Sequence, residues 1–271
     1  MSEILKALDK VWIYDIIIGY CDALASVCAS LRCACGGFLF GGSMIKKLNY
    51  FTKFEICLWL SSVSFITGSF LIFDRSNYLT LIASLVGITS LIFCAKGNPF
   101  GQLMMVVFSA IYGVISFGFA YYGEMLTYLG MTFPMAMISL ITWLKNPYKK
   151  NKAEVEVRRI KKSDVYALIV LTPIVTLTFF FILRALGNAN LLPSTLSVTT
   201  SFIAAFLCFR RSPYFALAYA VNDVVLILLW SLAAIKDFSY FSVIICFVVF
   251  LVNDLYSFTN WRRMQKRQAT K

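Results

Sequence analysis

The sequence predicts an all-α membrane protein with about eight transmembrane helices. Of its 271 residues, 60% are hydrophobic and 14% are charged, whereas about 25% are charged in an ordinary soluble domain. A water-exposed surface could not accommodate so many apolar side chains, but a lipid-facing surface can. The apolar residues fall into eight runs separated by short segments that hold most of the basic residues, the pattern of multi-spanning membrane proteins.

Each apolar run approaches the roughly 20 residues that a helix needs to cross a bilayer. Polar or basic residues mark the breaks between runs, among them the turn at 96–99, the basic stretch 145–164 and the turn at 210–213. Residues 44–271 therefore form one predicted transmembrane domain. In chain order, its predicted helices cover residues 55–73, 78–95, 100–120, 125–144, 165–185, 194–210, 213–235 and 239–259.

The distribution of basic residues supports this helix count, because such residues concentrate on the cytoplasmic side of membrane proteins. If the segment before residue 55 is cytoplasmic, 19 basic residues fall on the cytoplasmic side, and Arg75, Arg184 and Lys236 fall outside. We therefore expect a protein of the inner (plasma) membrane with both termini in the cytoplasm. The formal net charge of +12 then reflects membrane topology, and no nucleic-acid partner is expected.

Residues 1–43 differ from the rest of the chain. The stretch 12–42 carries three charged residues, so it is a poor spanning helix, and it lacks the features of a clean signal peptide. We interpret 1–43 as a dispensable extension, with Met44 as an alternative start. A peripheral amphipathic segment is the other interpretation.

Neither an enzyme nor a bound cofactor is expected. The chain has no histidine, which excludes histidine-based catalysis and histidine metal sites. It also has no phosphate-binding glycine loop and no nucleophile motif. Cys33 and Cys35 could bind a soft metal, but no second pair at ligand spacing supports a metal site. A receptor or scaffold would need a partner domain, and the longest loop is the basic stretch 145–164.

An internal repeat favours a transporter. The segments 96–100 and 210–214 each place a basic residue and a polar-Pro-aromatic turn between two helices, and Trp143 and Trp261 close the two triplets 118 residues apart. Both triplets run in the same direction, so one helix, 165–185, lies between them. The result is a 3+1+3 parallel repeat with an extra leading helix, a design in which the solute site lies near the midplane at the repeat interface.

Several predicted helices carry polar side chains that need a partner or a wet cavity within the membrane. They share helix faces with other polar residues, which suits a cavity that hydrogen-bonds a solute and stacks against its ring. Polar residues that only tie helices together are the alternative. The candidates are Gln102 and Tyr112 on 100–120, Asn222 and Trp230 on 213–235, and Asn253 and Tyr256 on 239–259.

Asp223 lies near the centre of its predicted helix, where an ionised carboxylate costs about 2.5 kcal/mol or more. No Lys or Arg in a helix centre is available to pair with it. We expect Asp223 to line a wet cavity, where it could couple transport to a proton or another cation. A structural carboxylate that caps polar groups of a neighbouring helix is the alternative.

The ordered set of these features resembles the Pnu-type (PnuC-like) vitamin transporters over about residues 44–265. The resemblance implies a fold like that of the SWEET sugar carriers and a homotrimer. It also implies facilitated diffusion of nicotinamide riboside, or of a mononucleotide-type NAD precursor, with trapping by phosphorylation in the cytoplasm. It is carried by Tyr121–Met125, Pro134–Met135, Trp143, Val157–Arg159, Ser197–Ser201, Arg210–Arg211, Asn222, Trp230, Asn253–Tyr256 and Asn260–Trp261.

The sequence departs from this family pattern at positions expected to contact the solute. Ala136 and Leu140 stand where the family favours Gln and Trp, and Phe215 stands where a tryptophan is common. Ring stacking could survive through Phe215 and Tyr219, but the hydrogen-bonding set must differ. Thiamine, riboflavin and deoxynucleosides therefore remain alternative substrates, with proton coupling as a further alternative.

Overall fold

The computed structural model describes residues 50–73, 75, 78–118, 122–149, 151–188, 190–235 and 237–270, with residues 115–118, 122–124 and 152 described by their backbone alone. The predicted extension 1–43, with Cys33 and Cys35, lies outside these residues. The chain forms two units, Met1–Ile56 and Cys57–Lys271, and all the packing described below lies within the second.

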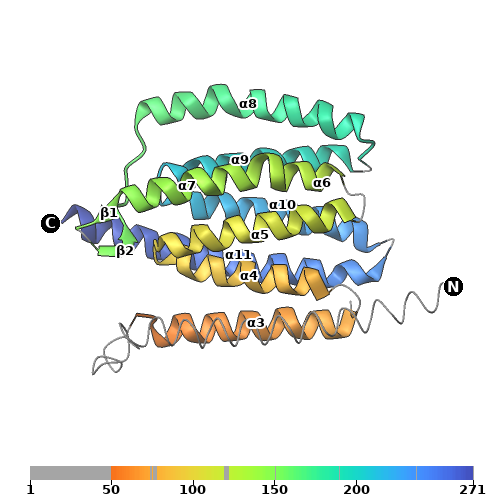
Figure 1. Cartoon of the computed structure of the whole chain (residues 1–271), viewed down its shortest axis with the longest axis horizontal. Coiled ribbons are helices and arrows are strands. Elements are labelled where there is room, and N and C mark those ends of the chain that lie inside the picture. The colour runs from red at the N-terminus through yellow and green to blue at the C-terminus, as the bar shows by residue number, and fades with distance from the viewer. Residues whose placement is uncertain are drawn as a thin grey trace. The chain divides into compact units, whose positions relative to one another are not determined.

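The predicted helices are present, and most of their ends agree within three residues (Figure 1). Among the described residues, seven helices are long and apolar enough to cross a membrane, and a shorter apolar helix covers Pro99–Val114. The helices are α3 (Lys53–Phe73), α4 (Tyr78–Ala95), α5 (Pro99–Gly118), α6 (Tyr122–Thr127), the π-helix η1 (Tyr128–Thr132), α7 (Phe133–Lys145), α8 (Lys162–Ala185), α9 (Leu191–Phe209), α10 (Tyr214–Ala234), the 3-10 helix η2 (Phe238–Tyr240) and α11 (Phe241–Ala269).

Two segments differ from the prediction. Helix α11 continues ten residues beyond its predicted end at 259, because Trp261 and Met264 are buried in the core and hold the extension in place. The loop 145–164 contains a short antiparallel hairpin of β1 (Pro147–Tyr148) and β2 (Asn151–Val155). Its turn includes Lys149 at φ 46°, a conformation that the composition of the loop does not reveal.

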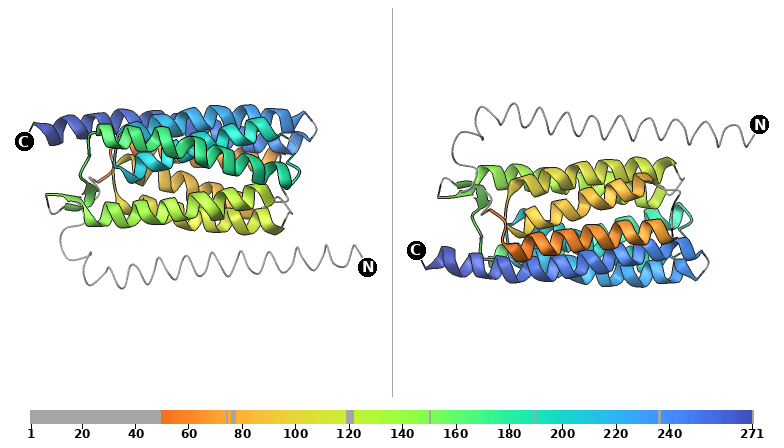
Figure 2. Two further views of the ribbon diagram at one scale, coloured as in Figure 1. Left: turned by 90° about the horizontal axis from the view of Figure 1, so that it is seen from above. Right: turned by 90° about the horizontal axis from the view of Figure 1, so that it is seen from below.

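The helices pack as two triplets with a linking helix. In the first triplet, α5 contacts both α4 and α7, and in the second, α10 contacts both α9 and α11. The triplets meet reciprocally, since the first helix of each contacts the last helix of the other: α4 contacts α11, and α9 contacts α7. Helix α8 joins the triplets and packs against α9, as Figures 1 and 2 show. This arrangement confirms the predicted 3+1+3 order behind a leading helix, α3.

The two turns predicted to be equivalent have the same backbone conformation. Gly97 (φ 66°) and Arg211 (φ 57°) both lie in the left-handed region after a helix end. In each turn the N–H of this residue donates to a cysteine carbonyl at 2.9 Å, and the next N–H closes a second bond at 3.0 Å. This is a Schellman cap. The repeat is therefore visible in the backbone even where glycine in one copy is arginine in the other.

Most basic residues of the second unit gather at one end of the helices. This basic end carries the turns 96–98 and 210–213, the β1–β2 hairpin and the last turns of α11 (Figure 1). The C-terminal ends of α8 and α10 lie at the opposite end (Figure 1). The split matches the sequence-based division of basic residues.

Candidate solute-binding cavity

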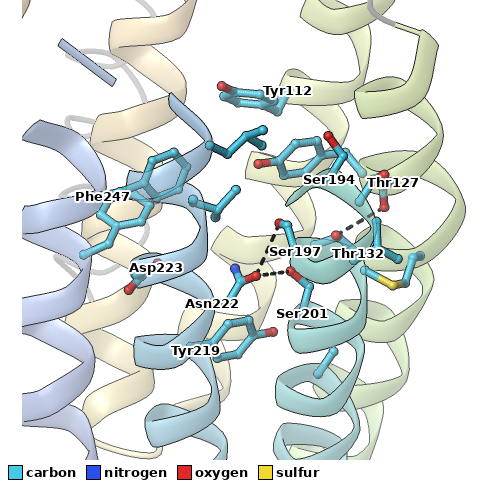
Figure 3. Close-up of a pocket in the computed structure, with 18 of the residues that line it drawn as sticks. Tyr112, Thr127, Thr132, Ser194, Ser197, Ser201, Tyr219, Asn222, Asp223 and Phe247 are labelled. Carbon is cyan, nitrogen blue, oxygen red and sulfur yellow. Dashed lines mark hydrogen bonds between the residues drawn. The ribbon is translucent and has the colours of Figure 1, made fainter. Parts of the chain in front are cut away.

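A cavity of about 140 Å³ lies between the two triplets (Figure 3). The first triplet lines it from α4, α5 and η1, and the second from α9, α10 and α11. On α9 the lining residues extend from Ala205 to Ser194, and on α10 from Tyr219 to Trp230. Transporters built from repeats hold their solute in this kind of location.

Asn222 on α10 is held by three hydroxyl groups of α9. Its Oδ1 accepts hydrogen bonds from Thr200 Oγ1 at 2.7 Å, Ser201 Oγ at 3.0 Å and Ser197 Oγ at 3.4 Å. Ser197 and Ser201 lie four residues apart on α9, so their side chains emerge on one face. No described residue accepts a hydrogen bond from Nδ2 of Asn222. The carbonyl oxygen is thus occupied, and the amide NH2 is available to an acceptor in the cavity (Figure 3).

A pair of carboxyl groups lies in the same wall. Asp223 and Asp254, on α10 and α11, are 4% and 3% exposed, and both line the cavity. Oδ2 of Asp223 has no hydrogen-bond partner within the described structure. Neither aspartate forms an ion pair with a described basic residue.

Aromatic rings form much of the remaining wall. Tyr112 and Tyr128 lie with ring centroids 4.5 Å apart, and Phe108 lies 5.5 Å and 5.9 Å from them. Tyr128 belongs to η1, which also presents Met131 to the cavity. A π-helical turn is rare and often marks a functional site. Here the π-helical turn places Tyr128, which lies between α6 and α7 in the sequence, against Phe108 and Tyr112 of α5.

Five of the predicted site residues line this cavity, namely Tyr112, Tyr219, Asn222, Asp223 and Trp230. The other four lie outside it. Gln102 donates to the sulfurs of Cys94 and Cys208, both at 3.2 Å, and Phe215 packs against Trp143 and Trp261. Asn253 donates to Ser62 Oγ on α3 and to the carbonyl of Val249, and Tyr256 is half-buried.

Sequence reasoning did not place three groups of cavity residues in the site. Ser197 and Ser201 lie among small residues on one helix face, a pattern that is typical of close helix packing. Asp254 repeats the Asn-Asp dipeptide of Asn222–Asp223 one helix later, which was the signal that could have included it. Nothing in the sequence indicates that Tyr128 lines the cavity, because helical periodicity does not reveal the π-helical turn that directs its side chain.

A buried cluster separates the cavity from the basic end. Its centre is formed by Trp143 and Trp261, both fully buried, and by Phe215. Tyr219 joins the two regions, because it lines the cavity and packs 6.2 Å from Phe215. We call this group the basic-end cluster: Cys94, Trp143, Val155, Leu207, Cys208, Phe215, Ala216, Trp261 and Met264.

The segment 146–161, here called the linker segment, ties the basic end together. The N–H of Val155 donates to the carbonyl of Gly97 at 2.9 Å, and the N–H of Arg158 donates to that of Arg211 at 3.0 Å. One segment therefore holds the equivalent turns of both triplets. It also holds α11, because Gln268 accepts from the N–H of Val157 at 2.7 Å.

Ionic contacts reinforce the linker segment. Asp164, 3% exposed at the start of α8, pairs with Arg210 and lies 3.7 Å from Arg158. Arg211 lies 3.7 Å from Glu156. Partial burial lowers the pKa of the Arg211 guanidinium, and the nearby Glu156 opposes that shift.

The opposite end of the helices lacks such a closing segment among the described residues, and the polar Asn188 and Ser194 line the cavity there.

Comparisons with known proteins agree with this architecture. A nicotinamide riboside transporter PnuC of Neisseria mucosa is 26% identical over 235 residues, 85% of this chain and 86% of the relative. One of Haemophilus influenzae is 24% identical over 192 residues, 70% of this chain and 82% of the relative. The crystal structure of the vitamin B3 transporter PnuC matches with a TM-score of 0.69 at 23% identity, over 80% of this chain and 94% of that one.

The fold of that crystal structure is thus the fold of this chain, a multi-spanning membrane protein. The family model for the nicotinamide mononucleotide transporters matches residues 77–263, which is more than half of the chain. The chain therefore belongs to the nicotinamide mononucleotide transporter family.

Proposed function

We propose that the protein carries nicotinamide riboside across the inner membrane by facilitated diffusion. The observation that carries the proposal is the amide of Asn222, held by three hydroxyls of α9 and aimed into an aromatic cavity between the triplets. The names of the two curated relatives support the choice of substrate.

The chemistry of the cavity suits this solute. Nicotinamide riboside has a flat ring, a carboxamide and ribose hydroxyls. Aromatic side chains stack on flat rings, and Tyr112, Tyr128 and Tyr219 provide such surfaces. The NH2 of Asn222 can donate to a carboxamide or hydroxyl oxygen. We expect the solute to leave unchanged, with phosphorylation in the cytoplasm trapping it.

The packing also suggests from which side of the membrane a solute can reach the cavity. The distribution of positive charge favours the basic end as the cytoplasmic end, and we propose on this ground that both termini lie in the cytoplasm. The basic-end cluster and the linker segment close that side, whereas polar residues line the other. We infer that this conformation faces outward and that transport proceeds by rocking of one triplet against the other. The family resemblance supports a homotrimer.

A thermal-shift panel on the purified protein tests the substrate. A solute at 100 times its dissociation constant should stabilise the folded state by about 2.7 kcal/mol. We expect stabilisation by nicotinamide riboside, lost in Asn222→Ala and retained in Asn151→Ala, a matched change on the exposed hairpin. Stabilisation by thiamine, riboflavin or a deoxynucleoside instead would preserve the transport function and change the substrate. The absence of any shift would contradict the proposal.

A further inference from the structure

Three arginine side chains gather where the linker segment meets the turn between α9 and α10. Arg158 and Arg210 reach the same carboxylate, that of Asp164: Nη2 of Arg158 lies 3.7 Å from it, and Arg210 makes a closer contact. Arg211 follows directly, and its carbonyl accepts the N–H of Arg158 at 3.0 Å. We call these three arginines the arginine cluster. Because arginine keeps its charge in proteins, the cluster holds three fixed positive charges.

The described acidic side chains do not balance the arginine cluster. The buried carboxylate of Asp164 is shared by two of its guanidinium groups. Glu156 lies 3.7 Å from the third, but its side chain is 62% exposed, so water screens that pair. The neighbouring Arg159, Lys161 and Lys162 are exposed and form no ion pair with a described residue. The start of α8 therefore carries a surplus of positive charge.

The two equivalent turns differ in this respect. Both caps place a residue in the left-handed region, and the first triplet uses Gly97 at φ 66° where the second uses Arg211 at φ 57°. The left-handed region disfavours any residue that has a Cβ atom, so the cap alone favours glycine. The arginine in the second turn indicates that its side chain has a role beyond closing the helix.

An exposed apolar surface begins next to this positive charge. Helix α8 starts at Lys162, and Tyr166 and Ile169, one and two turns later, are 69% and 62% exposed. They lie three residues apart and therefore on one face of the helix. The linker segment reaches α8 at the basic end (Figure 1). The order from basic to apolar follows the depth of a bilayer, whose phosphate groups lie outside its hydrocarbon core.

We propose that the arginine cluster and the first two turns of α8 form a binding site for one anionic phospholipid. The guanidinium groups of Arg158 and Arg210, whose side chains are 28% and 23% exposed, bind the lipid phosphate, and the acyl chains lie along Tyr166 and Ile169. Guanidinium groups suit phosphate because they donate two parallel hydrogen bonds to it. A soluble phosphate ester shares this chemistry but leaves the apolar surface uncovered.

The bound lipid ties together two parts of the basic end, because Arg158 belongs to the linker segment and Arg210 to the second triplet. None of the residues of this site lines the solute cavity. The inference is therefore independent of the proposed function, and either can fail without the other.

Native mass spectrometry of the purified protein in a neutral detergent tests the site. Phosphatidylglycerol, phosphatidylcholine with the same acyl chains and glycerol 3-phosphate are each titrated against the wild type. We expect one phosphatidylglycerol to bind per chain, about tenfold or more tightly than either of the other two ligands. Arg158→Gln keeps the backbone bond to Arg211 and removes the charge. It should weaken phosphatidylglycerol binding about tenfold, the effect of losing one charged hydrogen bond.

Arg263→Gln is the matched control, because Arg263 is an exposed arginine near the end of α11 and lies outside the arginine cluster. Its affinity for phosphatidylglycerol should stay within about twofold of the wild type. Arg159→Gln replaces Arg158→Gln if that variant does not fold, and should change the affinity in the same direction. An equal loss in the control would show diffuse attraction, and equal binding of the two lipids would show no preference for an anion. Either result overturns the inference. Glycerol 3-phosphate that binds as tightly as the lipid would overturn it too, because the site would then serve a soluble phosphate ester.

Discussion

Trp143 and Trp261 pack against each other where the two helix triplets meet, with ring centroids 5.3 Å apart. Each indole reaches into the other triplet. Trp143 Nε1 donates to the carbonyl of Cys208 at 3.1 Å, and Trp261 Nε1 donates to that of Cys94 at 2.8 Å. Each cysteine is the penultimate residue of the first helix of its triplet. The pair therefore locks the triplets together at the basic end.

This lock should be sensitive to loss of either indole N–H. In Trp261→Phe the carbonyl of Cys94 keeps only its bond from Gly97, and the smaller ring leaves space in a fully buried site. We expect a loss of about 1–3 kcal/mol and a lower unfolding temperature, measured in detergent by intrinsic fluorescence. Trp143→Phe should cost a similar amount, because its bonds are equivalent.

The double variant Trp143→Phe/Trp261→Phe adds a stricter check. The two rings touch, so their contributions should couple, and residues in contact usually show non-additive effects. We expect the double variant to lose measurably less than the sum of the two single losses. Strict additivity, or a neutral single variant, would show that the two indoles do not act as one lock.

The tryptophan pair also shows how far the sequence could predict this structure. The turns at Gly97 and Arg211 and the spacing of the two tryptophans revealed the repeat, because each copy needs the same cap and the same closing ring. The partners of polar side chains were less accessible. Asn253 donates to α3, which the sequence identified only as an extra leading helix. A stripe of polar residues shows that a partner is needed, but not which helix supplies it.

Asn222 also shows that the sequence does not reveal the partners of a polar side chain. Its place near the centre of a helix marked it as a candidate, and the structure puts it on the cavity wall. The three hydroxyls that fix its amide lie on the preceding helix. They look like packing residues in sequence because serine and threonine serve both purposes. The orientation of an amide depends on such neighbours, and only the folded structure places them together.

The hydroxyl of Thr200 should contribute to solute affinity without touching the solute. It makes the shortest of the three bonds to Asn222, at 2.7 Å, and is not among the residues that line the cavity. Thr200→Val keeps the shape and removes the donor. We expect the dissociation constant for nicotinamide riboside to rise about 2- to 12-fold, the range for one net hydrogen bond of about 0.5–1.5 kcal/mol.

Calorimetric titration of Thr200→Val and Thr200→Ser would check this expectation. Serine retains the hydroxyl, so Thr200→Ser should bind within about twofold of the wild type if the bond to Asn222 is what matters. If serine weakens binding as much as valine does, the methyl group and its packing are responsible instead. In that case the amide of Asn222 is not positioned by this contact.

The linker segment should control opening at the basic end. Asp164→Asn keeps the side-chain shape but removes the negative charge that faces Arg158 and Arg210. Two guanidinium groups then lose their shared partner, so we expect the linker segment to release the equivalent turns more often. The buried thiols of Cys94 and Cys208 should become reactive. Residue-resolved mass spectrometry after maleimide treatment would measure their labelling rates, which we expect to rise several-fold.

Arg267→Ala is the matched control for this experiment. It removes an ionic contact of the same region, with Glu154, but the Arg267 side chain is 56% exposed, and exposed ion pairs contribute little, about 0–1 kcal/mol. We expect labelling of Cys94 and Cys208 to stay near the wild-type rate in this variant. Equal labelling in Asp164→Asn and wild type would mean that the basic-end cluster, with its tryptophan pair, keeps that side closed without help from the linker segment.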